Sequence, residues 1–281
     1  MYLLSALTFL LSACICLKLA ALFMIHGINM HTELILLCVF AFLAGFTDAI
    51  AGGGGLIQTP AALVLLPQYP LATVLGTLKI PSFSGTSIAT VQYVRRVPVN
   101  WLLIGLMAVM AFCAAFAGST LLTHVNNSFM KPLLLFMLII VAIYTFSNKK
   151  FGDHLEKDHS FKQQVLYSLL ISLVIGFYDG FIGPGAGSFL ILAFIGLLGF
   201  DFLKASAHAK FVNLATNFGS ITFFMLSGKI IFAIALPMAA CNALGGWVGA
   251  RLAILKGDAF IRIFFLIVVC ATIIRFAYEV S

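Results

Sequence analysis

The stretch GFTDAIAGGGG at residues 45–55 recurs as GFYDGFIGPGAG at residues 176–187, which is 131 positions further along the chain. The same gapless shift superposes three further pairs, which are Gly52 with Gly183, Gly54 with Gly185, and Lys79 with Lys210. Apolar residues match by chance in an apolar chain, whereas aspartate, lysine and glycine at one register do not. The sequence therefore predicts an internal duplication, with repeats at residues 33–147 and 164–278.

Each repeat contains about five apolar segments, and the second segment of each is too short to cross a bilayer alone. These short segments lie at residues 56–66 and 188–198, whereas a membrane-spanning helix needs about 20 residues. Each one follows a cluster of glycines, where a regular helix is least favoured. Because this pattern is typical of discontinuous helices in transporters, we expect two glycine-broken helices at the middle of the membrane.

The composition indicates an all-α polytopic membrane protein. Of the 281 residues, 62% are hydrophobic and 9% are charged, and the mean hydropathy is +1.13, whereas about 25% of the residues of a soluble domain are charged. The ten-residue alternation of an outer-membrane barrel is absent, so the spanning elements must be helices. The net charge of +7 comes from basic residues scattered over short loops, which argues against a nucleic-acid partner.

The distribution of Lys and Arg separates two topologies. If the short segments cross with their partners, the repeats are inverted and most basic loop residues lie on the cytoplasmic side. If they dip in and return, the repeats are parallel and the basic residues divide more evenly. We therefore predict inverted repeats in the cell inner membrane, joined by a polar cytoplasmic linker at residues 148–163. Residues 1–30 are predicted to form an extra N-terminal helix or a signal-anchor, unless translation starts at Met24 or Met30.

Four ionisable side chains lie at predicted membrane depth, namely Asp48, Lys79, Asp179 and Lys210. Each costs about 2.5–3.5 kcal/mol at a helix centre, so the four must be paired or hydrated. Their formal charges sum to zero. One interpretation is a structural one, in which two ion pairs join one repeat to the other. The other is a direct role in binding a substrate or a proton.

The second interpretation draws on the glycine breaks. A helix that starts after such a break directs unpaired N–H groups and the positive end of its dipole into the gap, where an anion is stabilised. We expect the glycines Gly52, Gly54, Gly183 and Gly185 to form two such ends. Together with Lys79 and Lys210 they predict a positively charged pocket, in which Asp48 and Asp179 accept protons or orient the lysines.

Three more polar residues follow in the second repeat. Asn213 and Asn217 lie three and seven residues after Lys210, so they share its helical face and are predicted to line the pocket. His208 is interpreted either as a proton relay or as a hydrogen-bonded histidine between helices. No Cys and His spacing fits a zinc site, and no phosphate-loop, dinucleotide or hydrolase motif is complete. We therefore expect no metal, no cofactor and no enzymatic activity.

The motifs GFTDAIAGGGG, GFYDGFIGPGAGSF and AHAKFVNLATN closely resemble those of the sulfite exporter family of TauE/SafE type, over about residues 33–278. The resemblance implies an inner-membrane permease for sulfite, sulfonates or related organosulfur anions. It also implies functional roles for the matching Asp, Gly, Pro, Lys and Asn positions of the two motifs. The chain departs from the family pattern at Leu78 and Pro81, on either side of Lys79.

Two functional hypotheses remain. The first is secondary transport of a small anion by alternating access between inverted halves, coupled to protons or charge. The second is a non-transporting membrane assembly or receptor component, in which the intramembrane ion pairs are structural. The expected partners are a small anionic substrate and the lipid bilayer, with proton coupling and a homo-oligomer left open.

Overall fold

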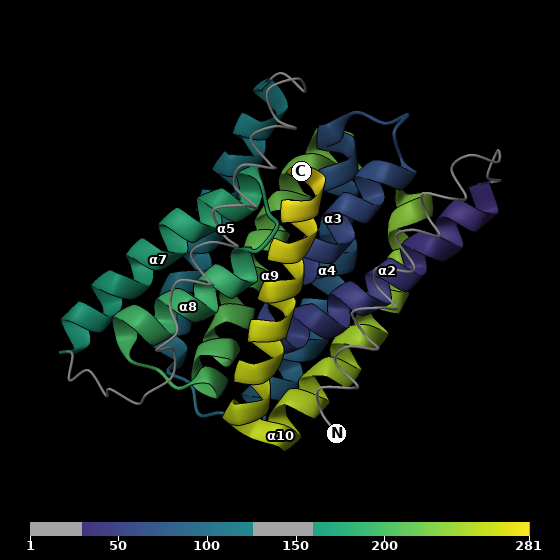
Figure 1. Ribbon diagram of the computed structural model, residues 1–281. Coiled ribbons are helices and arrows are strands. Elements are labelled where there is room, and N and C mark those ends of the chain that lie inside the picture. Colours follow the sequence, from purple (N-terminus) through teal and green to yellow (C-terminus); the bar gives the residue numbers. More distant parts are fainter. Residues whose placement is uncertain (1–29, 126–159, 281) are drawn as a thin grey trace.

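The computed structural model describes residues 30–125 and 160–280, and every element in these two ranges is a helix (Figure 1). The first range contains α2 (Met30–Ala51), α3 (Gly54–Leu65), α4 (Leu71–Val94) and α5 (Trp101–His124). The second contains α7 (Phe161–Phe181), α8 (Ala186–Leu198), α9 (Phe202–Leu226) and α10 (Phe232–Val280). The N-terminal helix predicted over 1–30, the last segment of the first repeat and almost all of the predicted linker lie outside the described residues.

Four of these helices are long and apolar enough to cross a membrane. They are the helical stretches Thr32–Ala51, Trp101–His124, Phe161–Phe181 and Phe232–Gly257. The shorter apolar helices are α3 and α8. The prediction of an all-helical membrane protein is therefore confirmed for the part of the chain that the structure describes.

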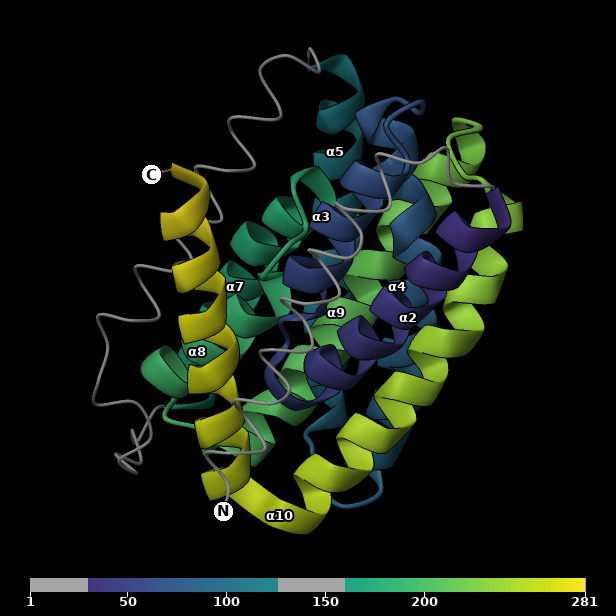
Figure 2. The same cartoon turned by 45° about the vertical axis from the view of Figure 1, so that its right-hand side comes forward.

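The helix boundaries repeat along the chain with the spacing of the motifs. Three helices of the first range, α2, α4 and α5, begin at Met30, Leu71 and Trp101. Three helices of the second range, α7, α9 and α10, begin 131 residues later, at Phe161, Phe202 and Phe232. Equivalent helices of the two halves do not start at the same capping residue. Asn100 caps α5 and Asp201 caps α9, each through a side-chain oxygen that accepts a hydrogen bond from the first turn. At Gly257, with φ of 70°, α10 breaks and its last part turns back along the molecule (Figure 2).

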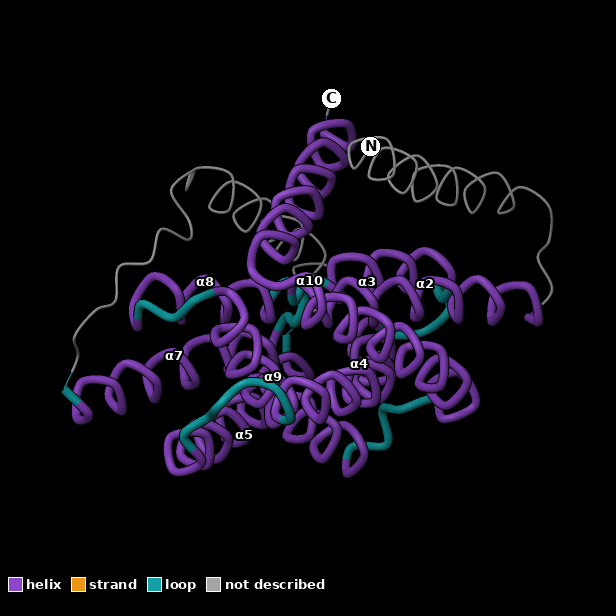
Figure 3. The backbone as a smooth tube through the Cα atoms, turned by 90° about the horizontal axis from the view of Figure 1, so that it is seen from below, coloured by secondary structure: helices purple, strands orange, loops and turns teal. Residues whose placement is uncertain are grey.

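The two sequence halves interlock in space. The helix α5 packs against α7 and α9, although it precedes them by a whole segment of chain, and α10 packs against α2 and α4 (Figure 3). The described helices thus form a first helix group of α2, α3, α4 and α10, and a second helix group of α5, α7, α8 and α9. Each group contains one long helix supplied by the other half of the sequence.

Glycine allows the helices within each group to approach backbone to backbone. A Cβ placed on Gly180 of α7 would lie 2.0 Å from the carbonyl oxygen of Ala115 on α5. A Cβ on Gly245 of α10 would lie 2.0 Å from the carbonyl oxygen of Phe42 on α2. Close backbone contact of this kind is how helices pack in lipid, where apolar side chains gain little from leaving the membrane.

Candidate functional site

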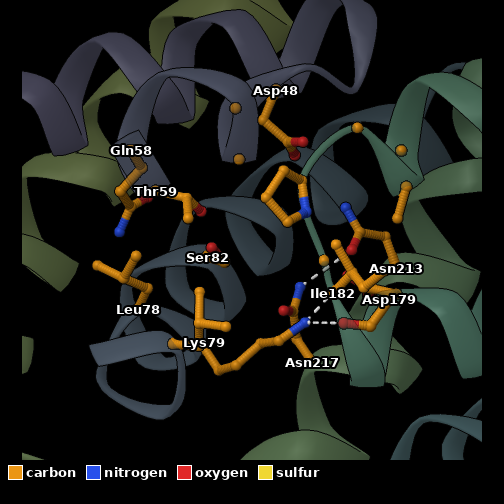
Figure 4. Close-up of a pocket in the computed structure, with 18 of the residues that line it drawn as sticks. Asp48, Gln58, Thr59, Leu78, Lys79, Ser82, Asp179, Ile182, Asn213 and Asn217 are labelled. Atoms are coloured by element: carbon orange, nitrogen blue, oxygen red, sulfur yellow. Dashed lines mark hydrogen bonds and ion pairs between the residues drawn. The ribbon is translucent and has the colours of Figure 1, made fainter. Parts of the chain in front are cut away.

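A cavity lies between the two places where α2 gives way to α3 and α7 gives way to α8. Its empty volume is about 650 Å³, its open side included. Its walls carry both glycine clusters and side chains from each helix group, and Figure 4 shows how these side chains converge. Among the polar residues that line it are Asp48, Gln58, Thr59, Lys79, Ser82, Asp179, Asn213, Asn217 and Asn242.

The backbone at the two breaks departs from helical geometry at glycine. Gly52 has φ of 72° and Gly183 has φ of 93°, values in the left-handed region that a residue with a Cβ rarely adopts. The breaks also touch one another, because the N–H of Ser188 donates to the carbonyl of Gly52 over 3.1 Å. The Ser188 hydroxyl donates to the carbonyl of Ala51 over 2.9 Å. These bonds hold the end of α2 against the start of α8.

The first ion pair joins Lys79 on α4 to Asp179 on α7. The Lys79 ammonium donates to the Asp179 carboxylate over 2.9 Å and to the Asp179 backbone carbonyl over 2.7 Å (Figure 4). Thr216 on α9 donates to the other carboxylate oxygen of Asp179. A lysine has three N–H donors, so one donor of Lys79 remains for a further partner.

The second ion pair joins Lys210 on α9 to Asp48 on α2. The Lys210 ammonium lies 2.8 Å from Asp48 Oδ2 and also donates to the Asp48 backbone carbonyl. Thr86 on α4 contacts the same carboxylate oxygen over 3.4 Å. Lys210 has no exposed surface, so its charge is balanced within the protein.

The two pairs are reciprocal. Lys79 and Lys210 stand at equivalent positions of the duplicated sequence, as do Asp48 and Asp179, and each lysine pairs with the aspartate of the other half. Each lysine also binds a carbonyl in the last turn of α2 or α7, where a cation is favoured by the helix dipole. Both pairs therefore connect the two helix groups, which is the arrangement that the structural interpretation of these residues requires.

The two lysines differ in their access to the cavity. Lys79 lines it, whereas Lys210 does not. The sequence led us to expect a pocket made positive by both lysines. In the structure each lysine is instead paired with an aspartate of the other half, at 2.9 Å for Lys79 and 2.8 Å for Lys210. The donors left at the cavity are the third N–H of Lys79 and backbone N–H groups.

The asparagines and the glycines of the motif all lie at the cavity wall. Asn213 and Asn217 both line the cavity, and the side-chain amide of Asn217 donates to that of Asn213 over 3.1 Å. Gly52, Gly54, Gly183 and Gly185 line it as well. The N–H groups of Gly54, Gly55 and Gly187 are at the helix starts, and none of them donates to another backbone group in the bonds that the described residues make across turns and loops.

His208 lies away from the cavity. It is buried, its Nδ1 lies 2.8 Å from the carbonyl oxygen of Lys204, and the rings of Phe194 and Phe200 pack around it. The surroundings match the interpretation of a satisfied histidine, and the residue does not line the cavity in which a relay would act.

Asn242 lines the cavity although the sequence did not point to it. This residue on α10 donates from its side-chain amide to Gln58 Oε1 over 3.1 Å. The duplication gave no signal, because the equivalent position of the first half is Ala111. A polar residue in an otherwise apolar run was the only available clue.

The described residues contain no group of three or more His, Cys, Asp or Glu side chains that is placed to hold a metal ion. The polar atoms of the cavity are instead ammonium, amide, hydroxyl and backbone N–H groups, together with two carboxylates. Both carboxylates are paired with lysines.

Comparison with known proteins places this arrangement in a family. The family model described as "Sulfite exporter TauE/SafE" matches residues 37–276. The chain belongs to the TauE/SafE family. It is 41% identical over 239 residues to a "Probable membrane transporter protein ORF9" of Sinorhizobium sp, an alignment that covers 85% of this chain and 90% of the relative. It is 37% identical over 243 residues to "Probable membrane transporter protein YfcA" of Escherichia coli, covering 85% and 87%.

A more distant relative is "Probable membrane transporter protein YunE" of Bacillus subtilis, which is 24% identical over 247 residues and aligns over 78% of this chain and 86% of the relative. No solved structure matches the chain. The family membership predicted from the glycine motifs is thus confirmed, and it identifies a membrane transporter family.

Proposed function

We propose that this protein is a secondary transporter that carries a small anion across the bacterial inner membrane, with sulfite or a sulfonate as the substrate. The observation that carries the proposal is the cavity between the two helix breaks, into which Lys79, two asparagines and glycine N–H groups converge. The sulfur-containing substrate is suggested by the description of the family model.

The proposed binding mode follows from the donors that remain. Lys79 uses two of its three N–H groups on Asp179, and the third is available to an anion oxygen. Asn213 and Asn217 add amide donors, and the starts of α3 and α8 add backbone N–H groups and the positive ends of two helix dipoles. A tetrahedral or pyramidal oxyanion presents several oxygens at once and matches donors that approach from several sides.

The proposed transport mechanism is alternating access between inverted halves of a multi-pass protein. The exchanged positions of α5 and α10, and the reciprocal ion pairs, support it because they relate two equivalent units around one cavity. A substrate site at the junction of two such units, next to broken helices, is the arrangement found in many secondary transporters. We propose the proton as the coupling ion. The mechanism is compatible with a homo-oligomer.

Flux through purified protein in liposomes tests this function. We expect wild-type protein to take up labelled sulfite or methanesulfonate. Lys79→Met should weaken anion binding about 10- to 100-fold, since a hydrogen bond to a charged group contributes about 1.5–3 kcal/mol. The matched control is Lys204→Met on α9, whose ammonium lies over the Phe200 ring outside the cavity. Equal flux in the two variants would reject the anion site.

A second candidate function has one observation in its favour, namely that both lysines are held in ion pairs between the helix groups. If the chain is a non-transporting assembly or receptor component, these pairs serve only to join the groups. Removing one partner of a buried pair costs about 3–5 kcal/mol. This candidate is favoured if Asp48→Asn and Lys79→Met lower the unfolding temperature sharply and no tested anion raises it for the wild-type protein.

A further inference from the structure

The two ion pairs present different groups to the cavity. Both members of the first pair, Lys79 and Asp179, line it, and Lys79 keeps one N–H donor beyond the two that bind Asp179. In the second pair Lys210 is fully buried and only the carboxylate, Asp48, faces it. The sequence duplication makes the pairs equivalent, so this difference comes from the conformation and not from the residue types.

The two carboxylates also differ in what their oxygens bind. Both oxygens of Asp179 accept hydrogen bonds, one from Lys79 and the other from Thr216. Lys210 and Thr86 both bind Oδ2 of Asp48, and Oδ1 accepts no hydrogen bond from any side chain of the described ranges. The Asp48 side chain is 17% exposed, against 6% for Asp179. A proton can therefore reach Asp48 Oδ1 without displacing an existing donor.

The charge balance of the cavity gives this oxygen a role. The formal charges of Asp48, Lys79, Asp179 and Lys210 cancel when the cavity holds no ligand. A monovalent anion beside Lys79 makes the total negative, and the excess is costly in a low-dielectric site. One proton on Asp48 restores neutrality.

We propose that Asp48 is the proton-binding residue of the transport cycle, and that its Oδ1 takes up one proton when a monovalent anion enters the cavity. The inference rests on the proposed transport function and specifies its coupling site. An O–H bond forms at Oδ1 with a proton from water in the cavity. Lys210 keeps its bonds to Oδ2 and to the backbone carbonyl of residue 48, so the link between the helix groups persists. The proton returns to water when the anion leaves.

Titratable groups face Asp48 from three other helices. Lys210 on α9 binds it directly, and Tyr93 on α4 lies nearby with its hydroxyl on the carbonyl of Ala49. Lys79 on α4 and Asp179 on α7 line the same cavity. The described parts of α3, α8 and α10 contribute only glycine, alanine, amide and hydroxyl groups to its lining. Of these groups, only Asp48 combines a free acceptor atom with access to the cavity.

An infrared pH titration tests the site without any substrate. The chain has only nine acidic residues, so the carbonyl band of a protonated carboxyl can be followed in difference spectra of the purified protein. We expect one band to be absent from Asp48→Asn and to remain in Asp179→Asn, which is the matched change at the equivalent position. Retention of every band in Asp48→Asn, or loss of the band in Asp179→Asn instead, would overturn the proposal.

A binding experiment tests the stoichiometry. Methanesulfonate stays fully ionised across the working pH range, so it carries no proton of its own. With wild-type protein in weakly buffered solution, we expect uptake of one proton per methanesulfonate bound. Asp48→Asn should bind methanesulfonate with no proton uptake, and Asp179→Asn should still take up a proton. Equal proton uptake by wild type and Asp48→Asn contradicts the assignment.

Transport separates failure of this site from failure of the proposed function. In liposomes, Asp48→Asn should lose the accumulation of methanesulfonate that a pH gradient drives with the wild-type protein. If wild-type protein moves no anion, the proposed function fails, and the infrared titration still decides whether Asp48 binds the proton. Should Asp48→Asn not fold, Asp48→Glu keeps a carboxyl at a different distance from Lys210, and an unchanged titration midpoint in that variant would reject the proposal.

Discussion

Replacing Gly180 with alanine should separate the two helices that belong to different halves of the sequence. Gly180 lies on α7 and faces α5 across a contact of backbone atoms. An added Cβ would lie 2.0 Å from the carbonyl oxygen of Ala115 and 2.7 Å from its carbonyl carbon and Cα. An ordinary contact of this kind is about 3.4 Å or more. No side chain can rotate away, so the helices must move apart by more than 1 Å or tilt.

The expected loss of stability follows from two opposing terms. Forcing an extra methyl group into a packed interface costs about 1–3 kcal/mol and occasionally more. Alanine in place of glycine inside a helix contributes about 1 kcal/mol in the other direction. Because the contact is entirely backbone, we take the upper part of the first range. The net loss in the free energy of unfolding is then about 2 kcal/mol.

Gly105→Ala is the matched control. Gly105 lies on α5 and is exposed, and a Cβ added at this position would have no atom within 4 Å. The same substitution there should leave stability unchanged or raise it by up to about 1 kcal/mol. Ala115→Gly should fail to rescue Gly180→Ala, since the clash is with backbone atoms and not with the Ala115 methyl group.

Unfolding by detergent titration in mixed micelles measures these differences. If Gly180→Ala is as stable as Gly105→Ala, α5 does not pack closely on α7. The conclusion that the two halves interlock would then be wrong as well. If both variants are equally destabilised, the loss reflects glycine flexibility and not the interface.

Three further predictions concern links within and between the helix groups and one buried hydrogen bond. Cys38 on α2 and Cys241 on α10 are free thiols that pack against the same core inside the first helix group. A disulfide formed between them should leave anion flux within about twofold of the reduced protein, because the bond adds no link between groups. A disulfide between the engineered cysteines of Phe83→Cys and Phe218→Cys, whose rings on α4 and α9 are 6.0 Å apart, should block flux until it is reduced; unimpaired flux would contradict relative motion of the groups. Tyr93→Phe removes a buried hydrogen bond of 3.0 Å to Ala49 and should lower the free energy of unfolding by about 1 kcal/mol, whereas an unchanged value would show that the bond contributes nothing.

Much of the fold is predictable from the sequence because lipid imposes strict rules. An apolar chain must satisfy its backbone within helices, and the superposed Asp, Gly and Lys residues gave the register of 131 residues. The interlocking of the halves was not predictable. Lipid-facing and helix-facing apolar residues look alike in sequence, so nothing marked α5 as a partner of α7 or α10 as a partner of α2.

The site was predictable in its members but not in its pairing. Membrane depth and duplication singled out Asp48, Lys79, Asp179 and Lys210, yet the pairing depends on how the halves interlock. The exclusion of Lys210 from the cavity also depends on three-dimensional packing, because its position is equivalent to that of Lys79. Asn242 was missed since it has no polar counterpart in the first half, and the duplication was the main source of signal.

The cost of the ion pairs argues that they do more than join the helix groups. A buried pair is often no more stabilising than two well-packed apolar side chains of similar size, and each charge at membrane depth costs about 2.5–3.5 kcal/mol before it is paired. Glycine packing already holds each group together, and Ser188 already ties the two breaks. Charges add what apolar contacts lack, which is an interaction that changes strength when a proton or an anion arrives. The exposure of Asp48 and Lys79 to one cavity puts both changes within reach of a substrate, and a purely structural pair would be better enclosed on both sides.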